Sequence, residues 1–194
     1  MTENREKGKL IIFSAPSGAG KTTLVKYVMS QVDNLTFSVS ACSREKREGE
    51  TNGKDYYFLS VEEFKEKIAA GEFIEWEEVY PDHFYGTLYS EVENKRERGL
   101  HVVFDVDVKG GMNIKKIFGD EALAIFIKPP SVDVLKERLL KRGTDRPEDI
   151  ETRVKKAEYE LTFARYFDVV IVNDDLKKAQ QETIGVIRDF LSDN

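Results

Sequence analysis

The stretch Leu10-Ile-Ile-Phe-Ser-Ala-Pro-Ser-Gly-Ala-Gly-Lys-Thr22 decides the fold. Its first four residues are apolar without interruption, which predicts a strand that is covered on both faces. A helical period begins at Lys21. Between the two, the segment from Ala15 to Thr22 has the Walker A spacing G-x-x-x-x-G-K-[ST], with Ala15 in place of the first glycine. A strand, a glycine-containing loop and a helix in this order predict a phosphate-binding loop at a helix N-terminus.

Each part of this loop has a predicted role. Gly18 and Gly20 let backbone N–H groups converge on phosphate oxygens. Lys21 is expected to reach the β- and γ-phosphates of a nucleotide, and the Thr22 hydroxyl to hold Mg²⁺. The alternative is a glycine-rich turn with a solvated lysine, and the strand and helix on either side favour the phosphate loop. The predicted binding residues are Ala15, Pro16, Ser17, Gly18, Ala19, Gly20, Lys21, Thr22 and Thr23.

Further apolar runs extend the pattern along the chain, at Val102 to Phe104, Leu123 to Ile127 and Val169 to Val172. Helical segments follow the runs, at 21–31, 108–118, 132–142 and 176–191. Alternating strands and helices of this kind predict an α/β fold, a doubly wound parallel sheet of the P-loop NTPase type. This predicted core comprises residues 1–35 and 100–194.

Residues 36–99 have a different residue pattern, with apolar and polar residues that alternate. Three half-exposed antiparallel strands are expected at Thr36 to Ser40, Asp55 to Leu59 and Phe73 to Val79. Two capping boxes, Ser60-x-x-Glu63 and Ser90-x-x-Glu93, predict helix starts, and the second helix is expected to end near Gly99. The sequence therefore predicts an inserted α+β subdomain.

The composition excludes several classes of protein. The chain has 194 residues with 30 Lys and Arg against 36 Asp and Glu, a formal net charge of −6, which argues against a nucleic-acid binder. Its longest apolar run, Ala122 to Ile127, is too short to span a membrane. With no apolar signal core near the N-terminus, a cytoplasmic address is expected. The single cysteine, Cys42, and the isolated His83 and His101 predict a passive thiol and no structural zinc site.

A basic loop lies inside the predicted subdomain. Arg44 and Arg47 are three residues apart in a glycine-containing segment, and Tyr56 follows. Guanidinium groups suit a phosphate dianion, and a phenol adds a neutral donor. Taken alone, the loop is equally a solvated turn.

From this loop onward the chain resembles the guanylate kinases. Their motif S-V-S-x-T-T-R-x-P-R-x-G-E-x-x-G-x-D-Y-x-F matches Ser38 to Phe58 in register, apart from Ala41-Cys-Ser43 and Lys46. The resemblance spans nearly the whole chain, through Glu72-Phe-Ile-Glu-Trp76, Tyr85-Gly-Thr87, Asp105-Val-Asp107, Pro129-Pro-Ser131, Arg138 to Thr144, Arg153 and Val172-Asn-Asp-Asp175.

The resemblance implies an acceptor site for GMP. Glu75 would accept hydrogen bonds from guanine N1–H and the 2-amino group, with hydroxyls of Ser40 and Thr87 beside it. From pattern alone, a solvent-facing strand residue is the favoured interpretation of Glu75, since Glu77 and Glu78 follow nearby. The phosphate would be held by Arg44, Arg47, Tyr56 and Tyr85, and Asp107 would lie toward GMP.

The resemblance also implies a donor site for ATP and a lid. Asp105 would act on Mg²⁺ directly or through water, although a helix-capping role stays open for Asp105 and for Asp107. A helical lid at about 138–155 would bring Arg138, Arg142 and Arg153 to ATP, and Asn173 and Asp174 would contact adenine. Positioned cations are the main protein contribution to phosphoryl transfer, so the residues expected to be catalytic are Lys21, Arg47, Arg142 and Arg153.

The sequence therefore predicts a guanylate kinase that uses Mg²⁺ and ATP to convert GMP, and dGMP by extension, to the diphosphate. Two alternatives remain at this stage. One is a catalytically inactive guanylate-kinase-like module that binds proteins, and the other is a kinase for a different monophosphate. The expected partners are ATP and GMP, with no nucleic acid or membrane, and the sequence does not decide whether the chain forms a homo-oligomer.

Overall fold

The computed structural model describes residues 6–142 and 147–193, with only the backbone of residues 142, 147 and 148. Its strands are β1 (Leu10–Ser14), β2 (Leu35–Phe37), β3 (Ala41–Cys42), β4 (Tyr57–Phe58), β5 (Phe73–Tyr80), β6 (His83–Leu88), β7 (His101–Asp105), β8 (Ala122–Lys128) and β9 (Val169–Val172). Its α-helices are α1 (Lys21–Gln31), α2 (Val61–Ala69), α3 (Tyr89–Arg96), α4 (Val108–Phe118), α5 (Val132–Arg142), α6 (Pro147–Leu161) and α7 (Leu176–Ser192). Two short 3-10 helices lie at Gly119–Glu121 and Ala164–Tyr166.

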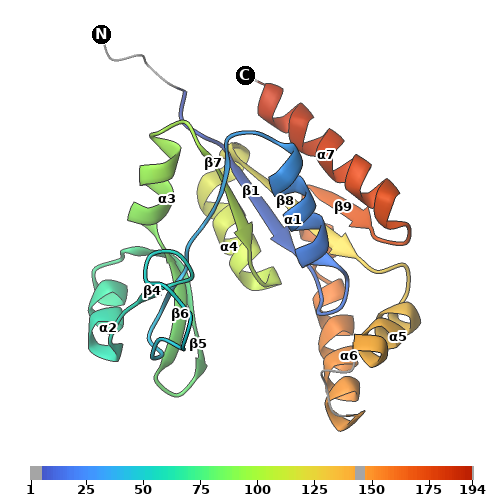
Figure 1. The fold of residues 1–194 in the computed structure, drawn as a ribbon, viewed down its shortest axis with the longest axis horizontal. Coiled ribbons are helices and arrows are strands. Elements are labelled where there is room, and N and C mark those ends of the chain that lie inside the picture. The colour runs from blue at the N-terminus through green and yellow to red at the C-terminus, as the bar shows by residue number, and fades with distance from the viewer. Residues whose placement is uncertain (1–5, 143–146, 194) are drawn as a thin grey trace. The chain divides into compact units, whose positions relative to one another are not determined.

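The larger of two sheets has five strands in the order β2-β7-β1-β8-β9 (Figure 1). β1 pairs in parallel with β8, and β8 pairs in parallel with β9. Every residue of β1 is buried, and β8 is buried except for its last residue, Lys128. Strands that are covered on both faces read as continuous apolar runs, so the runs in the sequence predicted them correctly. The predicted α/β fold with a parallel central sheet is confirmed.

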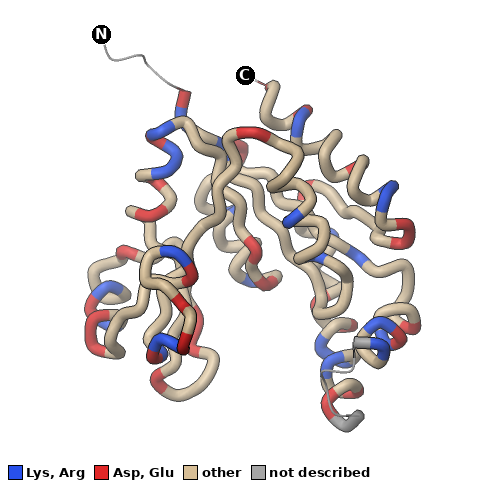
Figure 2. Tube along the Cα trace, in the orientation of Figure 1, with Lys and Arg blue, Asp and Glu red and all other residues tan. Residues whose placement is uncertain are grey.

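By its contacts, the chain divides into two compact units. The core unit comprises Leu10–Leu35 and Phe104–Asn194, and the small unit comprises Met1–Lys9 and Thr36–Val103. Acidic and basic residues are interspersed along the described chain of both units (Figure 2). Among the residues that the structure describes, no helix is both long and apolar enough to cross a membrane.

In the core unit, α4 packs against β1 and β8, and α1 packs against α7 (Figure 1). The approach of α4 to β1 is close, because a Cβ on Gly111 would lie 2.6 Å from Ser14 Oγ. The predicted bounds of α1, α4 and α5 agree with the structure, and α7 extends one residue further than predicted. The core unit thereby holds the phosphate loop at the carboxyl end of β1.

In the small unit, a sheet in the order β4-β3-β6-β5 packs against α2. Its buried core consists of Ala41, Phe64, Phe73, Phe84 and Leu88. The first capping box is confirmed, since Glu63 N donates to Ser60 Oγ at 3.0 Å and Ser60 N donates to Glu63 Oε2 at 2.7 Å. Cys42 is fully buried in β3, and burial raises the pKa of its thiol, as a passive cysteine requires.

Three local predictions were wrong. Ser90 does not cap a helix, because α3 begins at Tyr89. The Glu93 carboxylate pairs with Lys7 and Arg96 instead of accepting from the Ser90 backbone N–H. The strand expected at Thr36 to Ser40 ends at Phe37 as β2 of the larger sheet. The strand expected at Asp55 to Leu59 is the shorter β4, and it pairs with β3 in parallel, because a period of two does not encode strand direction.

Candidate active site

The phosphate loop has the backbone that its glycines predict. Gly18 and Gly20 have φ values of +90° and +95°, a region that residues with a Cβ rarely adopt. A Cβ on Gly20 would also lie 2.2 Å from Asn173 Nδ2. Ala19 N donates to Pro16 O at 3.1 Å, which closes the turn before α1 begins at Lys21. The loop therefore depends on glycine at position 20 for two separate reasons.

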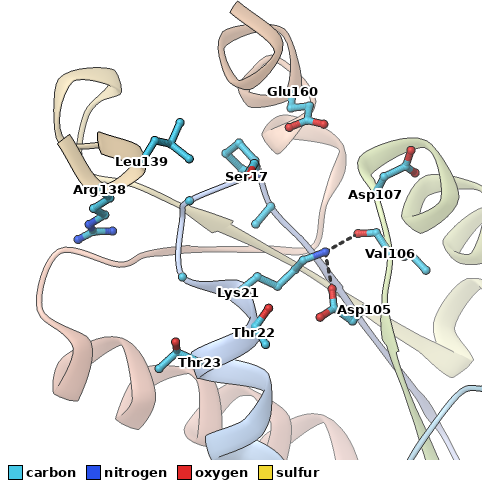
Figure 3. A pocket seen from close by; sticks show the side chains of 14 residues that line it. Ser17, Lys21, Thr22, Thr23, Asp105, Val106, Asp107, Arg138, Leu139 and Glu160 are labelled. Carbon is cyan, nitrogen blue, oxygen red and sulfur yellow. Dashed lines mark hydrogen bonds and ion pairs between the residues drawn. The ribbon is translucent and has the colours of Figure 1, made fainter. Parts of the chain in front are cut away.

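Lys21 reaches across the loop to the carboxyl end of β7. Its ammonium Nζ lies 2.5 Å from Asp105 Oδ1 and donates to Val106 O at 2.8 Å (Figure 3). Both side chains are partly exposed, at 18% for Lys21 and 29% for Asp105. The lysine is thus held by a carboxylate and a carbonyl at a site that solvent still reaches.

These residues line a pocket of about 600 Å³ in the core unit. It brings together most of the residues that were predicted to bind the donor nucleotide. Ala19, which is fully buried within the loop, is not among the lining residues. Figure 3 shows the lining side chains, which come from the loop, from the end of β7 and from α5 and α6. The lining residues are Ala15, Pro16, Ser17, Gly18, Gly20, Lys21, Thr22, Thr23, Asp105, Val106, Asp107, Arg138, Leu139 and Glu160.

Glu160 is a lining residue that the sequence did not single out. It lies on α6 and is only 7% exposed, and its Oε1 is 3.8 Å from Lys156 Nζ. Burial is the main reason that its pKa is raised. The available signal was its position seven residues after Arg153, because residues two helical turns apart share a face.

A smaller hollow of about 210 Å³ adjoins the loop, lined by Gly18, Gly20, Thr23, Arg138, Asn173, Asp174 and Leu176. Asn173 is buried, and its Nδ2 donates to Ala19 O at 2.8 Å. Arg138 Nη2 donates to Asn173 O at 2.9 Å. Asn173, one of the two residues predicted to lie near adenine, is thus fixed against the loop, whereas Asp174 is exposed.

The arginines predicted for the lid differ in their surroundings. Arg153 Nη1 lies 3.5 Å from Ser17 Oγ, at the outer limit of a hydrogen bond. Arg142 ends α5, and its side chain lies outside the described residues, as does the predicted lid segment at 143–146.

The two aspartates after β7 have different partners. Asp107 Oδ1 accepts from Gly110 N at 2.7 Å, so Asp107 is the N-cap of α4, the alternative that the sequence left open. Asp105 pairs with Lys21 and lines the pocket together with Thr22. Within the described part of the chain, no group of three or more His, Cys, Asp or Glu residues could enclose a metal ion. A hydroxyl and a carboxylate still suit Mg²⁺, which is commonly bound by one or two protein ligands plus phosphate oxygens.

The small unit holds the other predicted site residues. Arg44 forms a two-pronged pair with Glu50, with Nη1 to Oε2 at 2.7 Å and Nη2 to Oε1 at 2.6 Å. The guanidinium lies over the Tyr56 ring, 5.0 Å from its centroid, and the Tyr56 and Tyr85 rings meet edge to face at 6.0 Å. Hydrogen bonding to Arg44 lowers the pKa of Glu50 to about 2. These contacts fix the Arg44 side chain in one orientation.

Beside this group, β5 and β6 place Glu75 opposite Thr87. The Thr87 hydroxyl is fully buried and donates to Glu75 Oε1 at 2.7 Å. Ser40 is partly buried between β2 and β3, and Arg47 is exposed, with its backbone N donating to Glu50 Oε2 at 2.8 Å. Glu75 is therefore not the freely solvated strand residue that its neighbours in the sequence suggested.

The chain is similar to known proteins over nearly its whole length. The family model described as guanylate kinase matches residues 7–190. The chain is 57% identical to the guanylate kinase of Bacteroides thetaiotaomicron, over 95% of this chain and 91% of the relative. It is 51% identical to that of Salinibacter ruber, over 94% and 97%. The crystal structure of guanylate kinase from Anaplasma phagocytophilum, at 29% identity, matches 98% of this chain and 89% of that chain with a TM-score of 0.73. With this likeness over nearly its whole length, the chain belongs to the guanylate kinase family.

Proposed function

We propose that this protein transfers the γ-phosphoryl group of Mg²⁺-bound ATP to GMP, giving ADP and GDP, and that it also accepts dGMP. The observation that carries the substrate choice is the hydrogen bond from the buried Thr87 hydroxyl to the Glu75 carboxylate. A carboxylate only accepts, so it suits the adjacent N1–H and 2-amino donors of guanine. Adenine has no such pair, so the carboxylate would lose the two hydrogen bonds that guanine offers, at a cost in binding.

In this proposal, the small unit binds the acceptor. Arg44 and Arg47 would neutralise the GMP phosphate, and Tyr56 and Tyr85 would donate to its oxygens. The Arg44 side chain is already ordered by Glu50, so less conformational entropy is lost when a phosphate binds. Ser40 would add a contact to the base. Asp107, which caps α4, would contribute a further contact to GMP.

The core unit would bind ATP, with the phosphate-loop N–H groups around the β-phosphate. Lys21 would exchange its contact with Asp105 for the β- and γ-phosphates. Thr22 and Asp105 would hold Mg²⁺ directly or through water, and the ion would supply positive charge to the phosphate oxygens. Asn173 and Asp174 would face adenine. Arg138, Arg142 and Arg153 would close over the phosphates from a lid at about 138–155.

The reaction requires no general base, because the attacking oxygen belongs to a phosphate that is already anionic. Orientation and charge neutralisation supply the rate, and cations that follow the charge of the transferred group are the main contribution. We assign this role to Lys21, Arg47, Arg142 and Arg153. The predicted cytoplasmic address is part of the same proposal.

The test is a coupled assay for ADP release, with ATP and Mg²⁺ and with GMP, dGMP, AMP, UMP or CMP as acceptor. Turnover with the guanine nucleotides at least a hundredfold above the others is expected. Equal turnover with AMP would refute the assignment of Glu75, and no turnover with any acceptor would refute the proposed activity.

A further inference from the structure

The small unit contains a buried carboxylate that the proposed reaction does not use. Glu91 lies in the first turn of α3 and is 7% exposed. Burying a carboxylate is unfavourable unless hydrogen bonds and an opposite charge compensate for lost hydration. The groups that contact Glu91 therefore indicate which segments its buried carboxylate holds together.

Three groups from separate segments contact this carboxylate. Oε1 accepts from Val39 N at 3.1 Å, and Oε2 accepts from the Tyr57 hydroxyl at 2.8 Å. Lys95, one turn further along α3, forms an ion pair with Oε1 and donates to Phe37 O at 2.6 Å. We call Glu91 and Lys95 the α3 clamp. It fastens the segment after β2 and strand β4 to one helix.

The residues that the clamp holds are direct neighbours of proposed GMP contacts. Val39 precedes Ser40, and Tyr57 follows Tyr56. Tyr57 N also donates to Ser40 O at 2.9 Å, which joins the two segments. Consecutive side chains of an extended segment point to opposite sides. Tyr57 points to the clamp, and Tyr56 meets the ring of Tyr85 on the other side.

The Tyr57 hydroxyl donates at neutral pH. Burial, together with the hydrogen bond to Glu91, raises the pKa of Tyr57 to about 12. The phenol thus stays protonated, and the contact between Tyr57 and Glu91 persists across the physiological range.

We propose that Glu91 is a positioning residue for the acceptor nucleotide, which holds Ser40 and Tyr56 in place through Val39 and Tyr57. This inference rests on the proposed function, because it takes Ser40 and Tyr56 as GMP contacts. Glu91 itself lies behind these residues and acts through them.

The first test is Glu91→Gln. The amide has one accepting oxygen, while Val39 N, Lys95 and Tyr57 all supply donors, so the clamp loosens. We expect the Kd and KM for GMP to rise about tenfold, with kcat at saturating GMP and the Kd for ATP within about threefold of the wild type. Calorimetry with GMP and with ATP, together with steady-state kinetics, gives all four values.

The second test, Tyr57→Phe, removes one hydroxyl and leaves the ion pair, so it applies even if Glu91→Gln does not fold. A smaller rise in the KM for GMP, about threefold, is expected. In the double variant the two effects are expected to be less than additive, because both changes remove the same hydrogen bond.

Glu93→Gln is the matched control. Glu93 lies two residues further along the same helix and pairs with Lys7 and Arg96. We expect this change to lower the melting temperature and to leave the KM for GMP unchanged. If GMP affinity falls in proportion to melting temperature in both α3 variants, or stays unchanged in Glu91→Gln and Tyr57→Phe, the positioning role is overturned. A wild-type protein that neither binds nor phosphorylates GMP would instead overturn the proposed function and this inference with it.

Discussion

Replacing Glu75 by Gln tests the reading of the base most directly. The wild-type carboxylate accepts from the Thr87 hydroxyl at 2.7 Å, and that hydroxyl is fully buried. In the amide only one oxygen accepts. If it stays with Thr87, the NH₂ group faces the guanine donors, and if it turns to guanine, the buried hydroxyl faces a donor.

Either arrangement loses at least one hydrogen bond to a charged acceptor, worth about 1.5–3 kcal/mol. That loss predicts a rise of about ten- to a hundredfold in the KM for GMP, with a much smaller change in kcat. Discrimination between GMP and AMP, measured as the ratio of their kcat/KM values, should fall by the same factor.

The assay is the coupled measurement of ADP release with GMP and with AMP. Glu78→Gln is the control: Glu78 is the exposed acid on the opposite side of β5, and it accepts from Asp82 N at 2.9 Å. Its kinetics should match the wild type. A Glu75→Gln variant with a KM for GMP within twofold of the wild type and unchanged discrimination would refute the reasoning.

Other predictions concern the loop and the basic segment. Lys21→Ala should lower kcat about 10²–10³-fold while calorimetry finds GMP affinity within twofold; a loss of less than tenfold would contradict the role. Gly20→Ala, at φ +95° and with a Cβ 2.2 Å from a side-chain nitrogen, should destabilise the fold by about 1–3 kcal/mol, whereas Gly185→Ala on α7, with nothing within 4 Å, should not. Because Arg44 lowers the pKa of Glu50 from 4.5 to about 2, this pair stabilises the fold above about pH 4.5 and is lost toward pH 2. The melting-temperature difference between wild type and Glu50→Gln should therefore shrink over that range, and a constant difference would argue against the pair.

The core of the fold was predictable because its signals are local. The continuous apolar runs of β1 and β8 reflect burial on both faces, and α1 begins where the phosphate loop requires it. The second capping box failed for a non-local reason, since Lys7 and Arg96 occupy the carboxylate of Glu93. The direction of β4 could not be predicted from the sequence either, because it depends on which strand pairs with it.

In the candidate site, too, local signals were predictable and non-local contacts were not. The loop spacing and the resemblance indicated Lys21 and Glu75, but not the partners that hold them. Glu91 and Glu160 gave no motif, because their importance comes from burial among groups that are distant in sequence. Glu91 is recognised only from its three-dimensional contacts, whereas for Glu160 the helical spacing from Arg153 was the one available signal.

The ion pair between Lys21 and Asp105 affects which anions the phosphate loop binds. Among the described residues that line the larger pocket, the three acids Asp105, Asp107 and Glu160 outnumber the two bases Lys21 and Arg138, so the pocket has no excess of positive charge. A small free anion such as sulfate then gains little Coulomb energy by entering and must displace a carboxylate from the lysine. A triphosphate that carries its own divalent cation brings the positive charge that the pocket lacks. The loop therefore favours a metal-bound triphosphate over free inorganic anions.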